Sequence, residues 1–181
     1  RRYEWDGEGW LNTSSEIEGE GGINELKHLS ISADATRVVS GGRSGVSAAL
    51  VTHDWTGANW QISSETIVIP EMVFTDVSGL SLSISSDGQR LIASTTVSTR
   101  TYDWSEGTGW VPVNTWNERA TDLQLNDDGS KCSHGDKFDS SSKGVTRLLH
   151  WNDSSWTVEA TVCGDAFGDR YGQSAIISGD G

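Results

Sequence analysis

Pairs of tryptophan residues recur along this chain, with a short polar turn between the two members of each pair. The four pairs are Trp5 and Trp10, Trp55 and Trp60, Trp104 and Trp110, and Trp151 and Trp156. The first Trp of a pair follows the previous one after 50, 49 and 47 residues. A period of about 40–50 residues is typical of folds in which one small unit is repeated and each unit covers the apolar face of the next.

A second motif keeps a constant phase with the Trp pairs. Each copy has alternating apolar and polar residues followed by an Asp turn, and the turn residues are Asp34, Asp87, Asp128 and Asp180. Alternation predicts a strand with one buried face, and Asp-Gly between two such runs predicts a tight hairpin because Gly adopts positive φ at little cost. One repeat therefore resolves into four antiparallel strands, two flanking the Asp turn and two flanking the Trp turn.

Four antiparallel strands per repeat predict an all-β fold, namely a β-propeller of four-stranded blades. We expect residues 1–21 to supply the last two strands of one blade, and residues 22–73, 74–115 and 116–168 to form three complete blades. Residues 169–181 would supply the first strand of a further blade. Propellers usually close with four to eight blades, so about 3.75 blades predict part of a larger ring. A compact four-bladed ring, or completion by another chain, is the alternative.

The charge balance limits the classes of partner. The chain has 13 Lys and Arg residues against 26 Asp and Glu residues, a formal net charge of -13. Nucleic acid is not expected as a partner, because phosphate binding needs clustered cations. No apolar run approaches the ~20 residues that cross a bilayer, so no direct membrane insertion is expected. An acidic solvated surface is the simplest interpretation, and binding of divalent cations or of a basic partner is the alternative.

The last repeat contains Phe167-Gly168, Tyr171-Gly172 and the turn Ser178-Gly-Asp180-Gly181. In this order and phase, these residues resemble the FG-GAP repeats that build the propeller of the integrin α-chain head, above all the Trp-flanked bacterial and algal variants. The earlier repeats retain fewer of these motif residues. The resemblance implies a β-propeller that acts in protein–protein interaction or cell adhesion, with calcium loops of the form Asp-x-Asp-x-Asp-Gly.

The calcium loops of that family do not transfer to this sequence. The nearest approach, 126–129, lacks the alternation of ligands, and calcium needs six to eight oxygen atoms around it. We therefore expect no cofactor, with calcium as the open alternative. Asp136 and Asp139 are weak metal candidates, because they lie with His134 in the long loop between the second and third strands of the last complete blade. A flexible polar loop is the other interpretation of this segment.

Eight of the nine Trp residues occupy a fixed position in the repeat, which predicts packing between neighbouring sheets rather than platforms for sugars. Trp116 lies outside the pattern, in a connection between blades, and is a candidate for binding a ligand or partner. These connections share one face of a propeller with the loops between second and third strands, and loops on a rigid scaffold commonly carry binding. The other interface or ligand candidates are Phe138, Phe167 and Tyr171.

The sequence has no Gly-x-Ser-x-Gly elbow and no phosphate-binding glycine motif, so we name no catalytic residue and do not expect an enzyme. We predict an interaction, adhesion or assembly module that is extracellular, on the cell surface or in an organelle lumen. Its expected partners are other protein subunits or cell-surface and matrix components. A carbohydrate- or calcium-binding lectin-like propeller is the alternative, and a glycan-processing hydrolase is a third possibility. Asn12 and Asn152 lie in N-glycosylation sequons.

Overall fold

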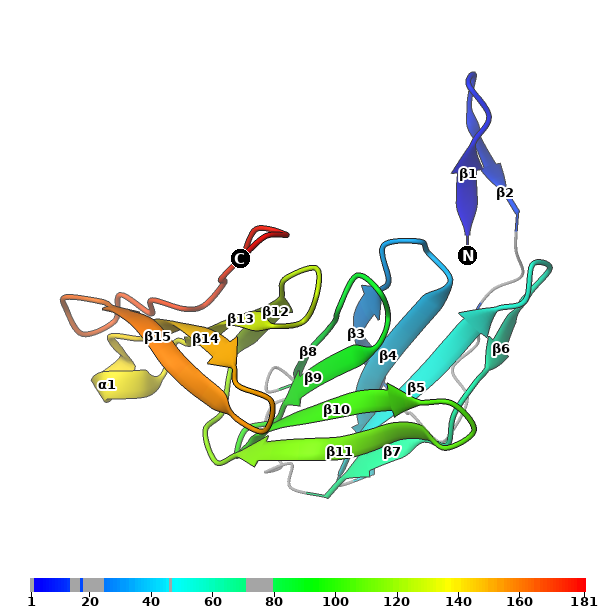
Figure 1. Ribbon diagram of the computed structural model, residues 1–181. Helices are drawn as coiled ribbons and strands as arrows, with labels where there is room; N and C mark the ends of the chain where they lie inside the picture. The colour runs from blue at the N-terminus through cyan, green and yellow to red at the C-terminus, as the bar shows by residue number, and fades with distance from the viewer. Residues whose placement is uncertain (1, 14–16, 18–24, 46, 71–79) are drawn as a thin grey trace.

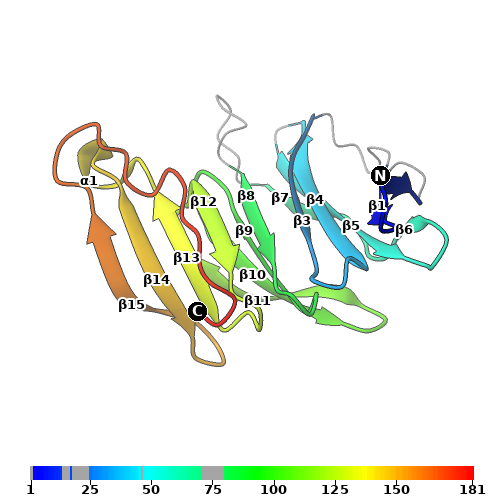
Figure 2. The ribbon, with the colours of Figure 1, turned by 90° about the horizontal axis from the view of Figure 1, so that it is seen from above.

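The computed structural model describes residues 2–13, 17, 25–45, 47–70 and 80–181. In these residues three antiparallel sheets lie side by side, and a separate two-stranded hairpin stands at the N-terminal end (Figures 1 and 2). The hairpin consists of β1 (Tyr3–Trp5) and β2 (Trp10–Asn12). The predicted all-β fold of four-stranded antiparallel blades is therefore confirmed.

Each sheet follows the chain from an inner strand to an outer strand. The first blade comprises β3 (Glu25–Ile31), β4 (Arg37–Ser44), β5 (Ser47–Trp55), β6 (Trp60–Ile62) and β7 (Ile67–Ile69). The second blade comprises β8 (Ser81–Ile84), β9 (Arg90–Ser94), β10 (Thr99–Ser105) and β11 (Gly109–Trp116). The third blade comprises β12 (Asp122–Leu125), β13 (Lys131–Asp136), β14 (Val145–Trp151) and β15 (Trp156–Cys163). The predicted boundaries at 21/22 and 73/74 lie outside the described residues, and the blade boundaries stay predictions.

Two features depart from regular four-stranded blades. The outer strand of the first blade is split, since β6 pairs with one half of β5 and β7 with the other half. A short helix, α1 (Asp139–Ser142), stands in the loop after β13. This is the only helix in the part of the chain that the structure describes, and its four residues are too few to cross a bilayer.

The Asp turns form as predicted between the first two strands of each blade. Asp34 accepts hydrogen bonds from the Ser32 hydroxyl at 2.7 Å and from the Thr36 N–H at 3.0 Å. Asp87 repeats this arrangement in the second blade, with contacts of 2.6 and 2.9 Å. The following residue has positive φ in each blade, and Gly serves this position in two of the three copies. The side-chain acceptor thus fixes the turn from within.

Residues 169–181 do not form the predicted strand, because Ala175 and Ile177 donate their N–H groups to side chains of β12 and not to backbone carbonyls. The segment nevertheless lies against β12 as a first strand would. The Ala175 N–H donates to Asp122 Oδ2 at 2.7 Å, just as the Leu123 N–H donates to Ser81 Oγ at 3.0 Å one blade earlier. Gly181 closes its Asp turn with a hydrogen bond to the Ser178 carbonyl at 3.0 Å.

The Trp pairs of the second and third blades pack against the blade before them, as the repeat predicts, whereas Trp5 and Trp10 of the N-terminal hairpin are mostly exposed. The two rings of each pair stand 5.2–5.6 Å apart, centroid to centroid. The Trp110 indole N–H donates to Thr52 Oγ1 of the first blade at 2.7 Å. Trp156 repeats this contact one blade later, with Thr101 Oγ1 at 2.8 Å. Apolar residues from the first three strands of the blades, joined by Ile69 and Trp110 of outer strands, fill the space between the same sheets.

The basic residue after each Asp turn bridges two blades. Arg90 forms two hydrogen bonds with Asp103, at 2.8 and 3.0 Å, within its own blade. It also donates to the Gly129 carbonyl in the Asp turn of the next blade at 3.1 Å, and lies 4.4 Å from the Trp151 ring centroid. Arg37 makes the same set of contacts one blade earlier. The Asp turns and Trp turns thus form one structural face, which we name the turn face.

Candidate interaction site

The opposite ends of the strands form the connection face, which carries the connections between blades and the loops between second and third strands. Its best defined part lies between the second and third blades. Thr121 joins the three segments that meet there. Its hydroxyl donates to the Gly172 carbonyl at 2.9 Å and accepts from the Lys137 N–H at 3.2 Å. The loop after β13 is therefore held between the connection 117–121 and the segment 164–174.

Arg119 and Asp136 form the central ion pair of this site. Asp136 is almost buried, and its Oδ2 lies 2.9 Å from Arg119 Nε. Its other oxygen accepts the Phe138 N–H at 2.9 Å. The Arg119 guanidinium carbon lies 4.9 Å from the Phe138 ring centroid, and Lys137 Nζ lies 5.0 Å from the same centroid. Arg119 and Lys137 thus both make cation–π contacts with the Phe138 ring, whose negative face attracts cations.

A second ion-pair group lies beside it. Arg147, on β14, contacts Asp139 Oδ2 at 2.7 Å and Glu118 Oε2 at 3.3 Å. Arg147 is largely covered, whereas Glu118 keeps about half of its side chain exposed. The two weak metal candidates from the sequence therefore lie at the end of β13 (Asp136) and at the start of α1 (Asp139), and each is paired with an arginine.

These pairs disfavour a metal centre at this position, because a cation would have to displace a guanidinium from each carboxylate. Among the described residues, no group of three or more His, Cys, Asp or Glu side chains is placed to hold a metal ion. The donor set of Asp136 and Asp139 thus gives the calcium alternative no support.

Trp116 does not stand open to solvent as a ligand platform. It is half-buried at the end of β11, and its ring lies 4.7 Å from that of His134, centroid to centroid. His134 is fully buried, and neither ring nitrogen has a hydrogen-bond partner among the residues that the structure describes. Burial and, to a smaller extent, the positive charge of Arg147 lower the pKa of His134 to about 4, against opposing contributions from its own backbone, Asp136 and Asp139. The ring is therefore neutral near pH 7.

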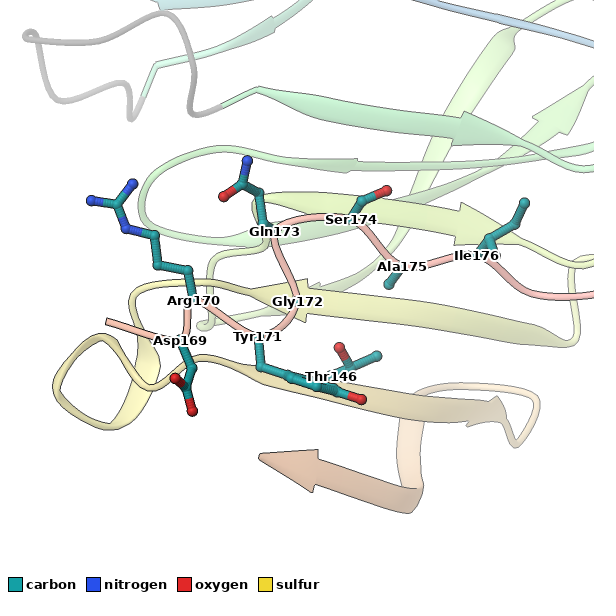
Figure 3. Close-up of a pocket in the computed structure, with 9 residues that line it drawn as sticks. All are labelled: Thr146, Asp169, Arg170, Tyr171, Gly172, Gln173, Ser174, Ala175 and Ile176. Carbon is teal, nitrogen blue, oxygen red and sulfur yellow. The ribbon is translucent and has the colours of Figure 1, made fainter. Parts of the chain in front are cut away.

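The three remaining candidates expose their aromatic rings on the connection face. Phe138 is 45% exposed, Phe167 81% and Tyr171 47%. Tyr171 is anchored by its backbone, which donates to the Lys143 carbonyl at 2.9 Å. In Figure 3 its side chain extends toward Thr146 on β14, beside a cavity of about 400 Å³, while Arg170 and Gln173 point to the other side of the segment.

Two side chains of types that are common in active sites, Cys132 and His28, have a shifted pKa. Cys132 is buried in the core between the second and third blades, and burial raises the pKa of its thiol far above the usual range. Burial lowers the pKa of His28, with partial opposition from the charge of Asp122. A buried thiol that stays protonated is inert as a nucleophile.

Comparison with known proteins adds evidence on the fold. No protein family and no curated protein matches the sequence. Among solved structures, a protein from Bacteroides fragilis provisionally assigned as a 6-phosphogluconolactonase superposes with a TM-score of 0.62 at 12% identity. A second protein with the same provisional assignment, from Bacteroides uniformis, gives 0.59 at 15% identity. Hydrazine synthase from Kuenenia stuttgartiensis gives 0.54 at 13% identity.

These likenesses cover 87, 83 and 85% of this chain but only 43, 44 and 41% of the three solved chains. The fold is that of a β-propeller. The chain spans less than half the length of the structures that it resembles, and at such low identity the likeness shows the fold alone.

The sequence located this site only in part. It singled out Phe138, Phe167 and Tyr171, which the structure places on the connection face. It gave no separate role to Arg119, Lys137 and Arg147, whose partners are distant in sequence or become apparent only with the fold. The one available signal for Arg119 was its position between the irregular Trp116 and the next strand.

Proposed function

We propose that this chain is a non-catalytic β-propeller interaction module whose connection face, at the third blade, contacts a partner protein. The observation that carries the proposal is the exposure of Phe138, Phe167 and Tyr171 on one face, beside the arginines of that face. Aromatic residues and arginine are enriched where proteins bind one another. The opposite face is used by turns and Trp pairs that hold the blades together, so it has a structural task of its own.

The proposal includes the finer inferences from the sequence. The FG-GAP resemblance supports adhesion or assembly as the role, with an extracellular, cell-surface or lumenal location. The partners would be other protein subunits or components of the cell surface or matrix. The provisional lactonase assignment of two structural neighbours gives a competing enzymatic hypothesis, and no described constellation of side chains favours it.

Site-specific photo-crosslinking tests the proposed face. A photoreactive amino acid is placed at Phe167 on the connection face and, in a matched variant, at the exposed Glu106 in the turn between β10 and β11. We expect a discrete crosslinked adduct from position 167 in extracts of the source organism and none from position 106. Adducts only from position 106 would refute the assignment of the face. Hydrolysis of 6-phosphogluconolactone by the purified chain would refute its non-catalytic character.

A further inference from the structure

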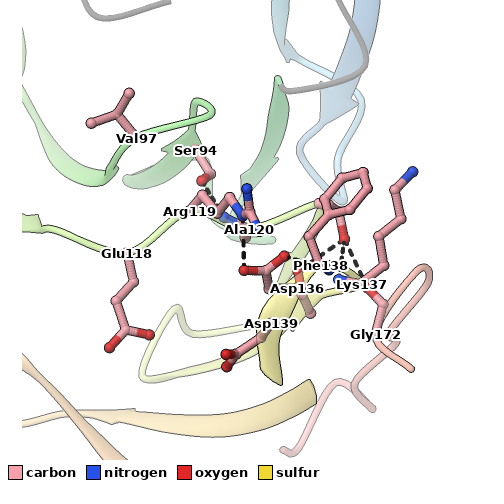
Figure 4. Close-up of polar contacts among 12 residues, drawn as sticks. Ser94, Val97, Glu118, Arg119, Ala120, Asp136, Lys137, Phe138, Asp139 and Gly172 are labelled. Carbon is pink, nitrogen blue, oxygen red and sulfur yellow. Dashed lines mark hydrogen bonds and ion pairs between the residues drawn. The ribbon is translucent and has the colours of Figure 1, made fainter. Parts of the chain in front are cut away.

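We propose that the connection face binds an acidic segment of its partner, with Arg119 and Lys137 as the residues that receive the carboxylates. This inference rests on the proposed function and adds the chemistry of the partner. Both cations approach the Phe138 ring, at 4.9 and 5.0 Å from its centroid. Figure 4 shows the Phe138 and Lys137 side chains projecting to the same side, while Glu118 and Asp139 point away from them.

Donor groups remain unused at this position. Arg119 engages Asp136 through Nε, and within the described part of the chain its two terminal nitrogens have no partner. Lys137 donates its backbone N–H to Thr121, but no carboxylate of the described residues pairs with its ammonium group. A guanidinium edge binds a carboxylate through two parallel hydrogen bonds, and a neighbouring ammonium adds a second charge-assisted contact.

The cation pair is also held in place before any partner arrives. Asp136 is almost buried, fixes the Arg119 side chain, and is itself fixed by the Phe138 N–H. Thr121 fixes the backbone of Lys137 and, through the Gly172 carbonyl, the segment that carries Tyr171. Groups that are already ordered lose less conformational entropy on binding, so the arrangement suits recognition better than a flexible basic loop would.

The distribution of charge points to an acidic partner. The segments 116–121, 136–147 and 164–174 contain five cationic and five acidic residues, so the whole net charge of -13 belongs to the rest of the chain. An acidic molecule is repelled by most of the surface, whereas this patch has no net charge and the Lys137 ammonium has no carboxylate partner among the described residues. Repulsion elsewhere and its absence at this patch favour one docking position and orientation for an acidic partner.

A protein segment fits this patch better than an acidic glycan. Sugar rings stack on open aromatic faces, but the Phe138 ring is approached by two cations and Trp116 lies against His134. Exposed Phe167 and Tyr171 instead offer contact area to apolar residues that flank a carboxylate. Arginine and aromatic side chains together are characteristic of residues that dominate binding energy between proteins.

Fluorescence anisotropy with a defined probe tests the inference. The probe is a fluorescein-labelled peptide with three Glu residues on each side of one Phe, and its matched control replaces every Glu by Gln. We expect saturable binding of the acidic probe only, weakened about tenfold or more by Lys137→Glu, since a charge-assisted contact is lost and a repulsive one is added. Arg43→Glu makes the same change of charge on the first blade and should alter affinity less than about twofold.

Each possible result of these binding measurements either supports or overturns the proposed binding of an acidic protein segment. No saturable binding up to about 1 mM, or binding that Lys137→Glu leaves unchanged, overturns the inference. Binding of oligogalacturonate that depends on Lys137, without peptide binding, assigns the site to an acidic glycan instead and also overturns it. If Lys137→Glu lowers the melting temperature, Lys137→Gln replaces it. A crosslink from position 167 together with failure of the peptide probe leaves the interaction face in place and removes only the acidic segment.

Discussion

The buried His134 should make the stability of the chain depend on pH in a specific window. Its ring is fully buried, its nitrogens have no hydrogen-bond partner in the described part of the chain, and its pKa falls to about 4 in the folded state. In the unfolded chain an imidazole titrates near 6.5. Because the folded-state pKa is the lower of the two, the unfolded state binds more protons between these values. The contribution of neutral His134 to the free energy of unfolding is therefore fully present above about pH 6.5, and it is lost as the pH falls toward 4.

The size of the effect follows from the two pKa values. A difference of one pKa unit corresponds to about 1.36 kcal/mol, so lowering the pH from 7 to 5 should cost about 2 kcal/mol through His134 alone. We choose pH 5 as the lower limit because Asp34 and Asp128, whose hydrogen bonds lower their pKa, remain ionised there. The full loss, reached near pH 4, is about 3 kcal/mol.

The contribution of His134 to the free energy of unfolding is measured by urea unfolding of the wild-type chain and of His134→Leu at several pH values between 7.5 and 5. We expect the variant to lose about 2 kcal/mol less than the wild type over this range. It should be at least as stable as the wild type at pH 7.5, since an unsatisfied buried polar group is removed. His150→Leu changes the half-exposed histidine of β14 and serves as the control. Identical pH dependence in wild type and His134→Leu would refute the reasoning.

Three further predictions concern the scaffold. Thr52→Val removes the hydrogen-bond acceptor of Trp110 between two blades and should cost about 1–3 kcal/mol in urea unfolding, whereas Thr52→Ser keeps the hydroxyl and most of the stability. Arg90→Met loses a partly exposed ion pair and a contact with the next blade, so we expect a loss of about 1–2 kcal/mol in the same assay. Gly144→Ala should lower the free energy of unfolding by about 2 kcal/mol or more and speed proteolysis of residues 164–181, because φ at Gly144 is +79° and a Cβ would collide with Tyr171 backbone atoms. For each of these three variants, an unchanged free energy of unfolding would contradict the importance of the contact that the substitution removes or disturbs.

The architecture could be predicted from the sequence because it is encoded locally and repeatedly. The Asp turn and the Trp turn each depend on residues within a few positions of one another, and each occurs several times in phase. The failure at 169–181 has a different origin. A β-strand is defined by backbone hydrogen bonds to a neighbour, and alternation in Ala175 to Ile177 does not reveal that this segment contacts β12 through side chains instead.

The site was less predictable because its contacts join segments that the repeat does not relate. Arg119 lies in the connection before β12 and forms an ion pair with Asp136 at the end of β13. The Lys137 ammonium contacts the ring of the next residue, Phe138, only because of the conformation of the loop after β13. Sequence spacing does not report such contacts. The choice of Trp116 as a candidate for binding a ligand or partner did not anticipate that a buried histidine would lie against its ring.

Departures from the repeat carry more information on function than the repeat itself. Counted from the basic residue after the Asp turn, the position of His134 is occupied by Ser40 in the first blade and by Ala93 in the second. The same junction holds the longest described loop between second and third strands and the irregular Trp116. Residues that recur in every blade pack that blade against the next one. The polar and aromatic residues between the second and third blades occur at this junction alone, so packing common to all blades does not explain them. For this reason we place the site at this junction.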